Sequence, residues 1–434
     1  MKPKGLLIAV VLLAVLGGLT WWSNKSQADK AKTPADAPVK LLSTPGDQFQ
    51  EVKIRKVTGE VLGLKLENGK WRMTAPQPLP ADQDAAGSMV SALVNLNADK
   101  VIEEKATDLK PYGLDVPTLD VQIVRKDGKT DHLLIGDDTL NGSGAYAKLA
   151  NDAKVVTVGT TTKTSLDKRP DDLRDKRLLT FDSDKLSRVE LAAKGPVIEF
   201  GKNGQNEWQM VKPRPLRADG SAVDVLVTKL KDAKMDLSET DANKKFAAAA
   251  KVATVTATDA GGTQTIDVRR DKDKNVFAKS SAVDGIYKIN ADLADALEKS
   301  VDDFRNKKLF DFGFSDPSKV EVQGKGYTKA GDKWTANGKT MDNSTVQNLI
   351  DKLRDLAATK FAEKGGGEPI VVASVVSNSG KRTEKVSISR QGTQYFAQRD
   401  GEPSIYELDA KIVEDLQKAA ADVKEAAPEQ TKKK

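Results

Sequence analysis

Three aspartates recur in this chain in the same local setting, each shortly after a tryptophan and directly before a helical pattern: Asp82, Asp219 and Asp342. A carboxylate present in every copy could bind a metal or act as a general acid. Either role needs a partner group at a defined distance, and none recurs beside these aspartates. Because aspartate is also among the preferred helix N-caps, we interpret all three as caps.

The three tryptophans of the same repeat are Trp71, Trp208 and Trp334. Exposed tryptophans could stack on a sugar ring, which would favour a glycan-binding protein. One tryptophan per copy at a fixed strand position is more typical of a hydrophobic core. We therefore expect these three side chains to be core residues.

His132 is the only histidine, and it has no counterpart in the other copies. A Ser-His-Asp triad is formally possible, but no Gly-x-Ser-x-Gly nucleophile elbow supports it. We expect His132 to lie on a surface strand. The chain has no cysteine, which excludes disulfides, thiol catalysis and cysteine metal sites.

Two loop-like segments resemble ligand-binding motifs only superficially. Residues 137–142, Asp-Asp-Thr-Leu-Asn-Gly, lack the alternating oxygen ligands and distal glutamate of a calcium loop, so we expect a hairpin turn. Residues 365–367 are three glycines without the lysine-serine ending of a P-loop, so we expect a plain loop. The sequence thus predicts no catalytic, cofactor-binding or metal-binding residues, and no cofactor.

A charged corner also recurs near the end of each copy. A set of opposite charges at these places could clamp one copy to the next, but we favour solvated helix-end charges. The pairs are Asp172/Arg174, Asp303/Arg305 and Asp422/Lys424.

The elements that must position these residues follow the same repeat. After each aspartate, apolar residues are spaced as on one face of an amphipathic helix. These residues are Met89, Leu93 and Leu96; Leu226, Leu230 and Ala233; Leu349, Leu353 and Leu356. The repetition predicts one module built three times.

Each module is expected to contain a first strand, the tryptophan strand, the amphipathic helix, a four-strand meander and a closing helix such as residues 290–307. Antiparallel sheet with helices on one side gives an α+β fold: three tandem repeats with two helices each, behind one N-terminal transmembrane helix. The expected meander strands are 119–124, 133–135, 145–149 and 155–158; 252–256, 265–268, 276–278 and 286–289; 371–376, 386–388, 395–397 and 405–408.

Residues 6–22 form an uncharged apolar run, preceded by Lys2 and Lys4. Its length is just sufficient for a bilayer, and the preceding lysines place the N-terminus in the cytoplasm. We favour an uncleaved anchor over a cleaved signal peptide. The expected organisation is an anchor at 1–24, a flexible linker at 25–46, modules at 47–181, 182–311 and 312–425, and a disordered basic tail at 426–434.

The net charge of +6 arises from 69 basic and 63 acidic residues, and no basic face with stacking aromatics accompanies it, so we do not expect nucleic-acid binding.

Residues 111–117, Pro-Tyr-Gly-Leu-Asp-Val-Pro, followed by Ile135-Gly136 and residues 144–146, resemble the bacterial family labelled domain of unknown function 4340. The resemblance also includes the N-terminal anchor and residues 71–82, and it is clearest over residues 53–179. The second and third modules have Phe246 and Phe361 in place of the Tyr-Gly-Leu motif. The resemblance implies a single-span envelope protein, encoded beside ATP-binding-cassette transporters, and it carries no assigned catalytic residues.

We therefore expect a non-enzymatic periplasmic binding or scaffolding protein, anchored in the inner membrane through residues 6–22 and associated with an ATP-binding-cassette transporter complex. Two alternatives stay open: an envelope glycan-binding protein, and an envelope hydrolase using Asp/Glu pairs.

Overall fold

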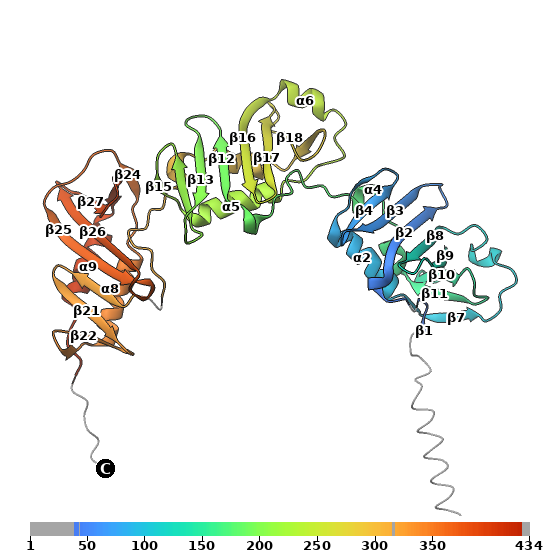
Figure 1. The fold of residues 1–434 in the computed structure, drawn as a ribbon, viewed down its shortest axis with the longest axis horizontal. Helices are drawn as coiled ribbons and strands as arrows, with labels where there is room; N and C mark the ends of the chain where they lie inside the picture. Colours follow the sequence, from blue (N-terminus) through green and yellow to red (C-terminus); the bar gives the residue numbers. More distant parts are fainter. Residues whose placement is uncertain (1–38, 43, 315–316, 428–434) are drawn as a thin grey trace, which may run out of the picture. The chain divides into compact units, whose positions relative to one another are not determined.

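The structure is a computed structural model that describes residues 39–42, 44–314 and 317–427. The expected anchor at 6–22 and most of the expected tail lie outside these residues. Within the described part, no helix is both long and apolar enough to cross a membrane. The chain divides into two compact units, residues 1–176 and 177–434, of which the first holds module 1 and the second holds modules 2 and 3 (Figure 1).

Module 1 is built around one antiparallel nine-stranded sheet with the order β5-β4-β3-β2-β8-β9-β10-β11-β7. The strands before the helix pair in sequence, and β2 pairs with β8 to join them to the later meander. The strands are β2 (Phe49–Lys56), β3 (Val61–Glu67), β4 (Lys70–Ala75), β5 (Leu79–Pro80), β7 (Lys100–Glu103), β8 (Leu119–Arg125), β9 (Thr130–Asp138), β10 (Gly144–Leu149) and β11 (Val155–Gly159).

One face of this sheet packs against helices. Along β8, buried residues alternate with half-buried ones, as expected for a strand with one face on a core. Helix α2 (Gln83–Val94) places Met89 and Leu93 in the core, as their spacing predicts. The shorter helices α3 (Thr160–Leu166) and α4 (Pro170–Leu173) add Leu166 and Leu173 to it.

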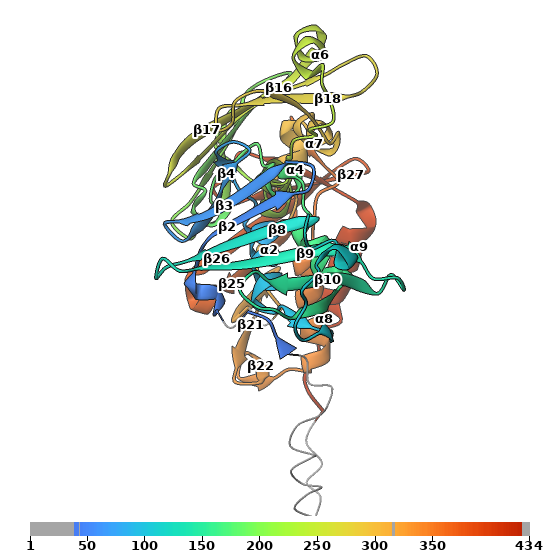
Figure 2. The same cartoon turned by 90° about the vertical axis from the view of Figure 1, so that its right-hand side faces the viewer.

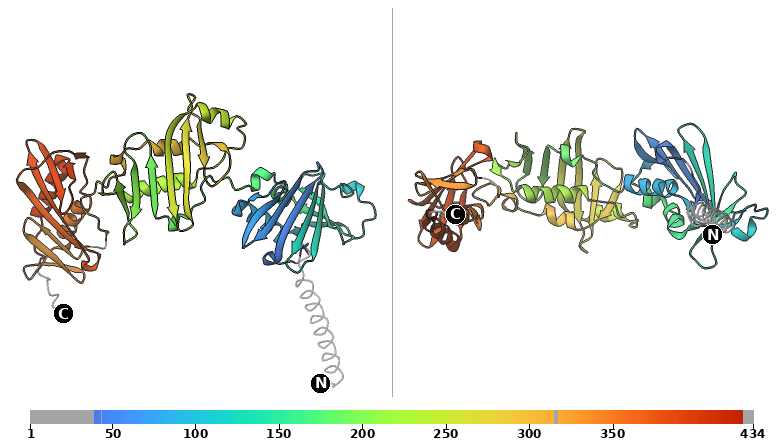
Figure 3. Two further views of the ribbon diagram at one scale, coloured as in Figure 1. Left: turned by 45° about the horizontal axis from the view of Figure 1, so that its top comes forward. Right: turned by 90° about the horizontal axis from the view of Figure 1, so that it is seen from below.

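Module 2 repeats this plan with an eight-stranded sheet of order β15-β14-β13-β12-β16-β17-β18-β19. Helix α5 (Gly220–Lys231) runs across one face of the sheet, as Figure 3 shows. The strands are β12 (Arg188–Ala192), β13 (Ile198–Lys202), β14 (Trp208–Lys212), β15 (Leu216–Arg217), β16 (Ala250–Asp259), β17 (Gly262–Arg270), β18 (Val276–Ser280) and β19 (Ile286–Ile289).

Module 3 has a nine-stranded sheet of order β23-β22-β21-β20-β25-β26-β27-β28-β24. Helices α8 (Asn343–Arg354) and α9 (Ala410–Ala421) pack together over its inner face. The strands are β20 (Lys319–Val322), β21 (Lys325–Ala330), β22 (Lys333–Ala336), β23 (Lys339–Thr340), β24 (Lys360–Ala362), β25 (Pro369–Ser377), β26 (Arg382–Gln391), β27 (Gln394–Arg399) and β28 (Ile405–Leu408). Repeated antiparallel sheets with helices on one face confirm the α+β expectation, and all four predicted meander strands form in every module.

The recurring aspartates close each module through their backbone as well as their side chains. The N–H of Asp82 donates to the carbonyl of Leu173 at 2.8 Å, and the N–H of Asp219 donates to Phe304 at 2.8 Å. In module 3 the N–H of Asp342 donates to Lys424 at 2.9 Å. The recurring aspartate is therefore the place where the end of each module returns to its first long helix.

Module 2 also replaces an edge strand by a helix. Strands β7 and β24 pair with the last meander strand in modules 1 and 3. At the corresponding place, module 2 has the helix α6 (Ala242–Ala248), which packs beside β18 and β19 (Figure 2). The sequence did not lead us to expect this helix.

Two expectations about the elements are wrong. Among the described residues, only module 3 has two helices of 12 residues, α8 and α9. In module 1 the closing region is divided into α3 and α4, and in module 2 the expected helix at 290–307 stops after α7 (Asp292–Leu297). Ser300 is extended there, and its N–H and hydroxyl bind Asp303, which starts a separate 3-10 turn, η4 (Val301–Phe304). Each module also has unexpected strands before its first long helix: β3, β13 and β21, and the two-residue strands β5, β15 and β23. Strand β21 buries only Tyr327, so its sequence lacks the usual alternation.

The expected boundaries also shift. Part of the expected linker belongs to module 1, because β1 (Val39–Lys40) pairs with β6 (Asn97–Ala98) and Leu42 is buried in the core. Residues Leu178, Leu179 and Phe181 pack in the core of module 2, although we assigned them to module 1. Leu309 and Phe310 likewise pack in the core of module 3. Ala426, the first residue of the expected tail, donates to Thr340, and residues 428–434 lie outside the described part.

Candidate functional site

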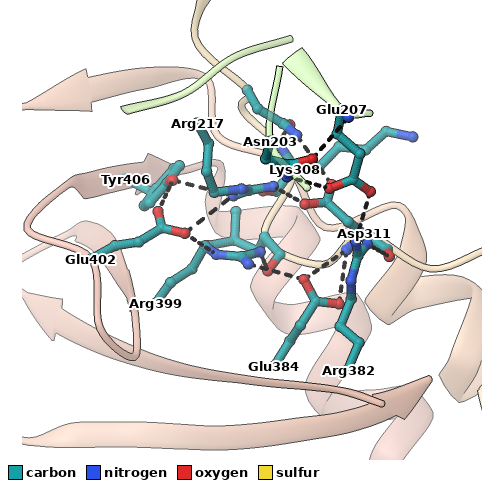
Figure 4. Close-up of polar contacts among 12 residues, drawn as sticks. Asn203, Glu207, Arg217, Lys308, Asp311, Arg382, Glu384, Arg399, Glu402 and Tyr406 are labelled. Carbon is teal, nitrogen blue, oxygen red and sulfur yellow. Dashed lines mark hydrogen bonds and ion pairs between the residues drawn. The ribbon is translucent and has the colours of Figure 1, made fainter. Parts of the chain in front are cut away.

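A cluster of buried and partly exposed charged residues lies where the chain passes from module 2 to module 3. Strands β15, β26, β27 and β28 contribute to it, together with loop residues of the same unit (Figure 4). We call this set the junction network; its members are Glu207, Arg217, Asp311, Arg382, Glu384, Arg399, Glu402 and Tyr406.

Arg217, at the end of β15 in module 2, reaches into module 3. Its guanidinium donates to the carbonyl of Lys308 at 2.8 Å and pairs with Asp311 at 2.5 Å. It also contacts the hydroxyl of Tyr406 at 3.3 Å, and only 13% of its side chain is exposed. Burial opposes its charge, but Asp311, Tyr406 and Glu402 outweigh that cost and raise the pKa of Arg217.

Glu384 is the most buried carboxylate of the network, with 5% of its side chain exposed. Its two oxygens accept the backbone N–H of Asp311 at 3.1 and 3.0 Å. The guanidinium of Arg399 pairs with Glu384 at 2.9 Å and with Glu402 at 2.8 Å, and it also donates to the carbonyl of Leu309. Glu384 and Arg399 thus hold the connecting segment against the sheet of module 3.

Arg382 completes the connection back to module 2. It donates to the carbonyl of Asp311 at 2.9 Å and pairs with Glu207, in the turn between β13 and β14, at 2.7 Å. The hydrogen bond from Arg382 lowers the pKa of Glu207, and Asn203 adds to the effect. Every member of the network therefore has a partner of opposite charge or a hydrogen-bond donor.

Tyr406 is the member whose pKa is displaced furthest. Burial, followed by the neighbouring Glu402, raises its pKa to about 12. A general acid or base near neutral pH needs a pKa close to that pH. The network raises the pKa values of Arg217 and Tyr406 and lowers the pKa of Glu207, so all three pKa values move away from neutral pH. Such shifts suit a structural clamp better than proton transfer.

An open cleft of about 510 Å³ adjoins the network in the second unit. Three carboxylates line it: Glu207, Asp224 and Asp311. Asp224 accepts the indole N–H of Trp208 at 2.9 Å, and the other two are held by arginines. A hydrolase would need one of these acids to give up its partner before it could act on a substrate.

The structure confirms the interpretation of the repeated aspartates. The side chain of Asp82 accepts from the N–H groups of Asp84 and Ala85, that of Asp219 from Ala222, and that of Asp342 from Ser344. Trp208 and Trp334 are core residues, 7% and 5% exposed, whereas Trp71 is only partly buried against the core of module 1.

The remaining candidates lie where we expected them, with one exception. His132 lies on β9, half-buried, with its Nε2 2.6 Å from Asp120. Asp137 and Asp138 end β9, residues 139–143 form the turn between β9 and β10, and residues 365–367 lie in a loop.

The exception is the charged corner, where Arg305 is buried rather than solvated. It stacks over the ring of Phe361 at 3.3 Å and donates to Ser404 at 2.9 Å, both in module 3. At Arg305, the charged corner therefore clamps module 2 to module 3, which is the alternative that we did not favour from the sequence.

The junction network itself was missed, because none of its members is one of the repeated tryptophans or aspartates. A signal was nevertheless present in the strands. Glu384 stands in phase with the buried residues Val386 and Ile388, and Arg399 stands in phase with Tyr395 and Ala397. Charged residues at inward positions of a strand require partners.

The motif Tyr112-Gly113-Leu114 forms a tightly packed turn on module 1. Tyr112 ends the short 3-10 helix η2 (Lys110–Tyr112), and Gly113 follows in the left-handed region with φ of 63°. The Tyr112 hydroxyl donates to Glu103 at 2.9 Å, and its ring meets that of Tyr146 edge-on at 5.1 Å. These contacts give the motif a packing role.

The lowered pKa of Glu207 predicts that the stability of the junction network depends on pH. A carboxylate whose folded pKa lies below its ordinary 4.5 stabilises the fold above that value, and the contribution is lost as the pH falls through the folded pKa. We expect hydrogen-exchange protection of residues 203–207 and 382–384 to be constant between about pH 6 and 8 and to fall below about pH 4. The variant Arg382→Gln should remove most of this change, and equal acid sensitivity in both proteins would contradict the prediction.

Comparison with known proteins identifies the family of the chain. The family model described as Domain of unknown function (DUF4340) matches residues 71–207 and 208–373, and each match begins on one of the repeated tryptophans. No curated protein and no solved structure matches the chain. Because the family model covers most of its length, the chain belongs to this family.

Proposed function

We propose that this member of the family with Domain of unknown function (DUF4340) is a non-enzymatic binding or scaffolding protein of the bacterial envelope. In this proposal, residues 6–22 anchor it in the inner membrane, with a cytoplasmic N-terminus and periplasmic modules. The observation that supports it most is the junction network, in which the buried charges are used to fix module 3 to module 2.

A rigid pair of modules suits a protein that presents surfaces to a partner. The carboxylates and arginines of the junction satisfy one another, so none is left to act on a substrate without breaking the connection. The outer face of each sheet carries polar side chains, such as Lys53 on β2, Thr263 on β17 and Lys385 on β26. These faces are the surfaces that we propose for partner binding.

The glycan-binding alternative loses its main support, because Trp208 and Trp334 are buried. The cleft at the junction does not support the hydrolase alternative either. Its three carboxylates already bind Arg382, Trp208 and Arg217, and we therefore do not favour it.

The proposed partner is a subunit of an ATP-binding-cassette transporter complex, which rests on the family resemblance. The test is photocrosslinking in native membranes from a reactive amino acid placed at Lys53, Thr263 or Lys385. We expect at least one position to capture a transporter subunit, and we expect that adduct to disappear in a strain lacking the transporter. Recovery of only self-contacts from all three positions would refute the proposed association.

A further inference from the structure

A second cavity lies within module 2, away from the junction network. Its volume is about 630 Å³, within the range of roughly 300–1,000 Å³ that is usual for small-molecule sites. Four segments surround it: the residues after β12, the end of α6 with the start of β16, the end of β17, and the end of α7. The lining residues are Ala193, Lys194, Ala248, Ala250, Lys251, Val252, Arg270, Asp271, Lys272 and Glu298.

The apolar part of this cavity consists of small side chains. Ala193, Ala248 and Ala250 line it without filling it, and the nearly buried Val252 forms part of the wall. The register between β16 and β17 shifts between Lys251 and Ala253, which is a β-bulge. Such bulges re-aim side chains at strand ends, and here the shift falls at the wall of the cavity.

The charged side chains that line the cavity differ in whether they form ion pairs and hydrogen bonds. Its two carboxylates are already bound: Glu298 pairs with Arg270 at 2.9 Å, and Asp271 accepts the backbone N–H and the side-chain amide of Asn275 at 2.8 and 3.0 Å. Arg270 pairs in addition with Asp295 at 2.5 Å. In the described part of the chain, none of the three lysines that line the cavity forms an ion pair: Lys194, Lys251 and Lys272.

We propose that this cavity binds an anionic amphiphile, in which a single alkyl chain packs on the alanine and valine wall and a phosphate or carboxylate headgroup pairs with Lys194, Lys251 and Lys272. The three ammonium groups supply the charge that such a headgroup needs, and the apolar wall supplies the surface for the chain. An uncharged alkyl molecule would leave the lysines unused, and a free anion would leave the apolar wall exposed to water.

The test uses the full chain in nanodiscs of neutral phosphatidylcholine and an alkyl phosphate that carries a photoreactive diazirine near its tail. After irradiation, labelled peptides are mapped by mass spectrometry. We expect labelling to concentrate on residues 248–252, and we expect unlabelled alkyl phosphate to compete for it. Parallel competition by the alkyl carboxylate of equal length distinguishes the two headgroups.

The variant Lys194→Gln, Lys251→Gln, Lys272→Gln should reduce the labelling about tenfold, because three weak charge contacts are lost together. The matched control is Lys231→Gln, Lys244→Gln, Lys279→Gln, which removes the same charge from exposed positions of module 2 outside the cavity. This control should label like the unmodified protein. A second variant, Ala250→Glu, places a carboxylate in the apolar wall and should also reduce labelling.

Three outcomes would overturn the proposal. Equal competition by the uncharged alkyl alcohol would show that the lysines do not recognise a headgroup. Equal competition by inorganic phosphate would show that no alkyl chain is bound. Labelling that stays outside residues 248–252, or that is unchanged in both the lysine variant and Ala250→Glu, would place the amphiphile elsewhere.

Discussion

Replacing Glu384 by alanine is expected to destabilise the second unit by about 3 kcal/mol, the lower end of the range for breaking a buried ion pair. The substitution removes the acceptor of the Asp311 backbone N–H and the carboxylate that Arg399 contacts at 2.9 Å. Arg399 keeps Glu402 at 2.8 Å, so it is not left entirely without a partner. The segment that joins modules 2 and 3 should loosen first, because it is held through Asp311 and Leu309.

Urea denaturation of the full chain, followed by hydrogen exchange of peptides within 305–314, measures both effects. The control is Lys385→Ala, the next residue of β26, which is exposed on the opposite face of the strand. It should change the free energy of unfolding by less than about 0.5 kcal/mol. A change of similar size in both variants, or unaltered exchange in the joining segment of Glu384→Ala, would contradict the role of Glu384.

The pair can also be tested as a unit. The double variant Glu384→Met, Arg399→Met removes both charges and should recover much of the stability lost in Glu384→Ala, because apolar side chains of similar length need no ionic partner. Any remaining deficit reports the hydrogen bonds to Asp311 and Leu309 and the ion pair of Arg399 with Glu402, which methionine cannot replace.

The parts of the fold that could be predicted from the sequence are those that depend on local residue patterns. The spacing of Met89 and Leu93 placed α2, and the preference of aspartate for N-caps placed Asp82 at its start. Strand β21 was missed because it buries only Tyr327, so its sequence shows no alternation that could be recognised. The closing helix of module 2 was overestimated, because Ser300 and Asp303 start a new turn inside an otherwise helical pattern.

The candidate site could not be predicted in the same way, because it depends on contacts between residues far apart in the chain. Arg217 meets Asp311 and Tyr406 only after module 3 has folded. The repeat identifies only residues that the modules share. The junction network joins one particular module to the next, so its residues have no reason to recur.

The second large effect on stability is expected from a change in the packing around the Tyr112-Gly113-Leu114 motif. The variant Gly136→Ala should destabilise module 1 by about 3 kcal/mol, the upper part of the range for overpacking. A Cβ at Gly136 would lie 2.1 Å from the carbonyl oxygen of Tyr112 and 3.0 Å from the backbone of Gly113. Both neighbours are backbone atoms, so β9 or the Tyr-Gly turn must move. Movement would also strain the bond from Thr118 to the carbonyl of Gly136, now 3.1 Å.

Hydrogen exchange of peptides within 110–118 and 130–138 in the full chain measures this effect where it should occur. Gly87→Ala is the matched control, because it lies inside α2 with nothing within 4 Å of the added Cβ. That variant should stabilise α2 by roughly 0.5–1 kcal/mol, since alanine is the better helix former. If Gly136→Ala leaves protection in both peptides unchanged, the Tyr-Gly turn does not pack on β9 as tightly as the geometry indicates, and the motif must serve something other than packing.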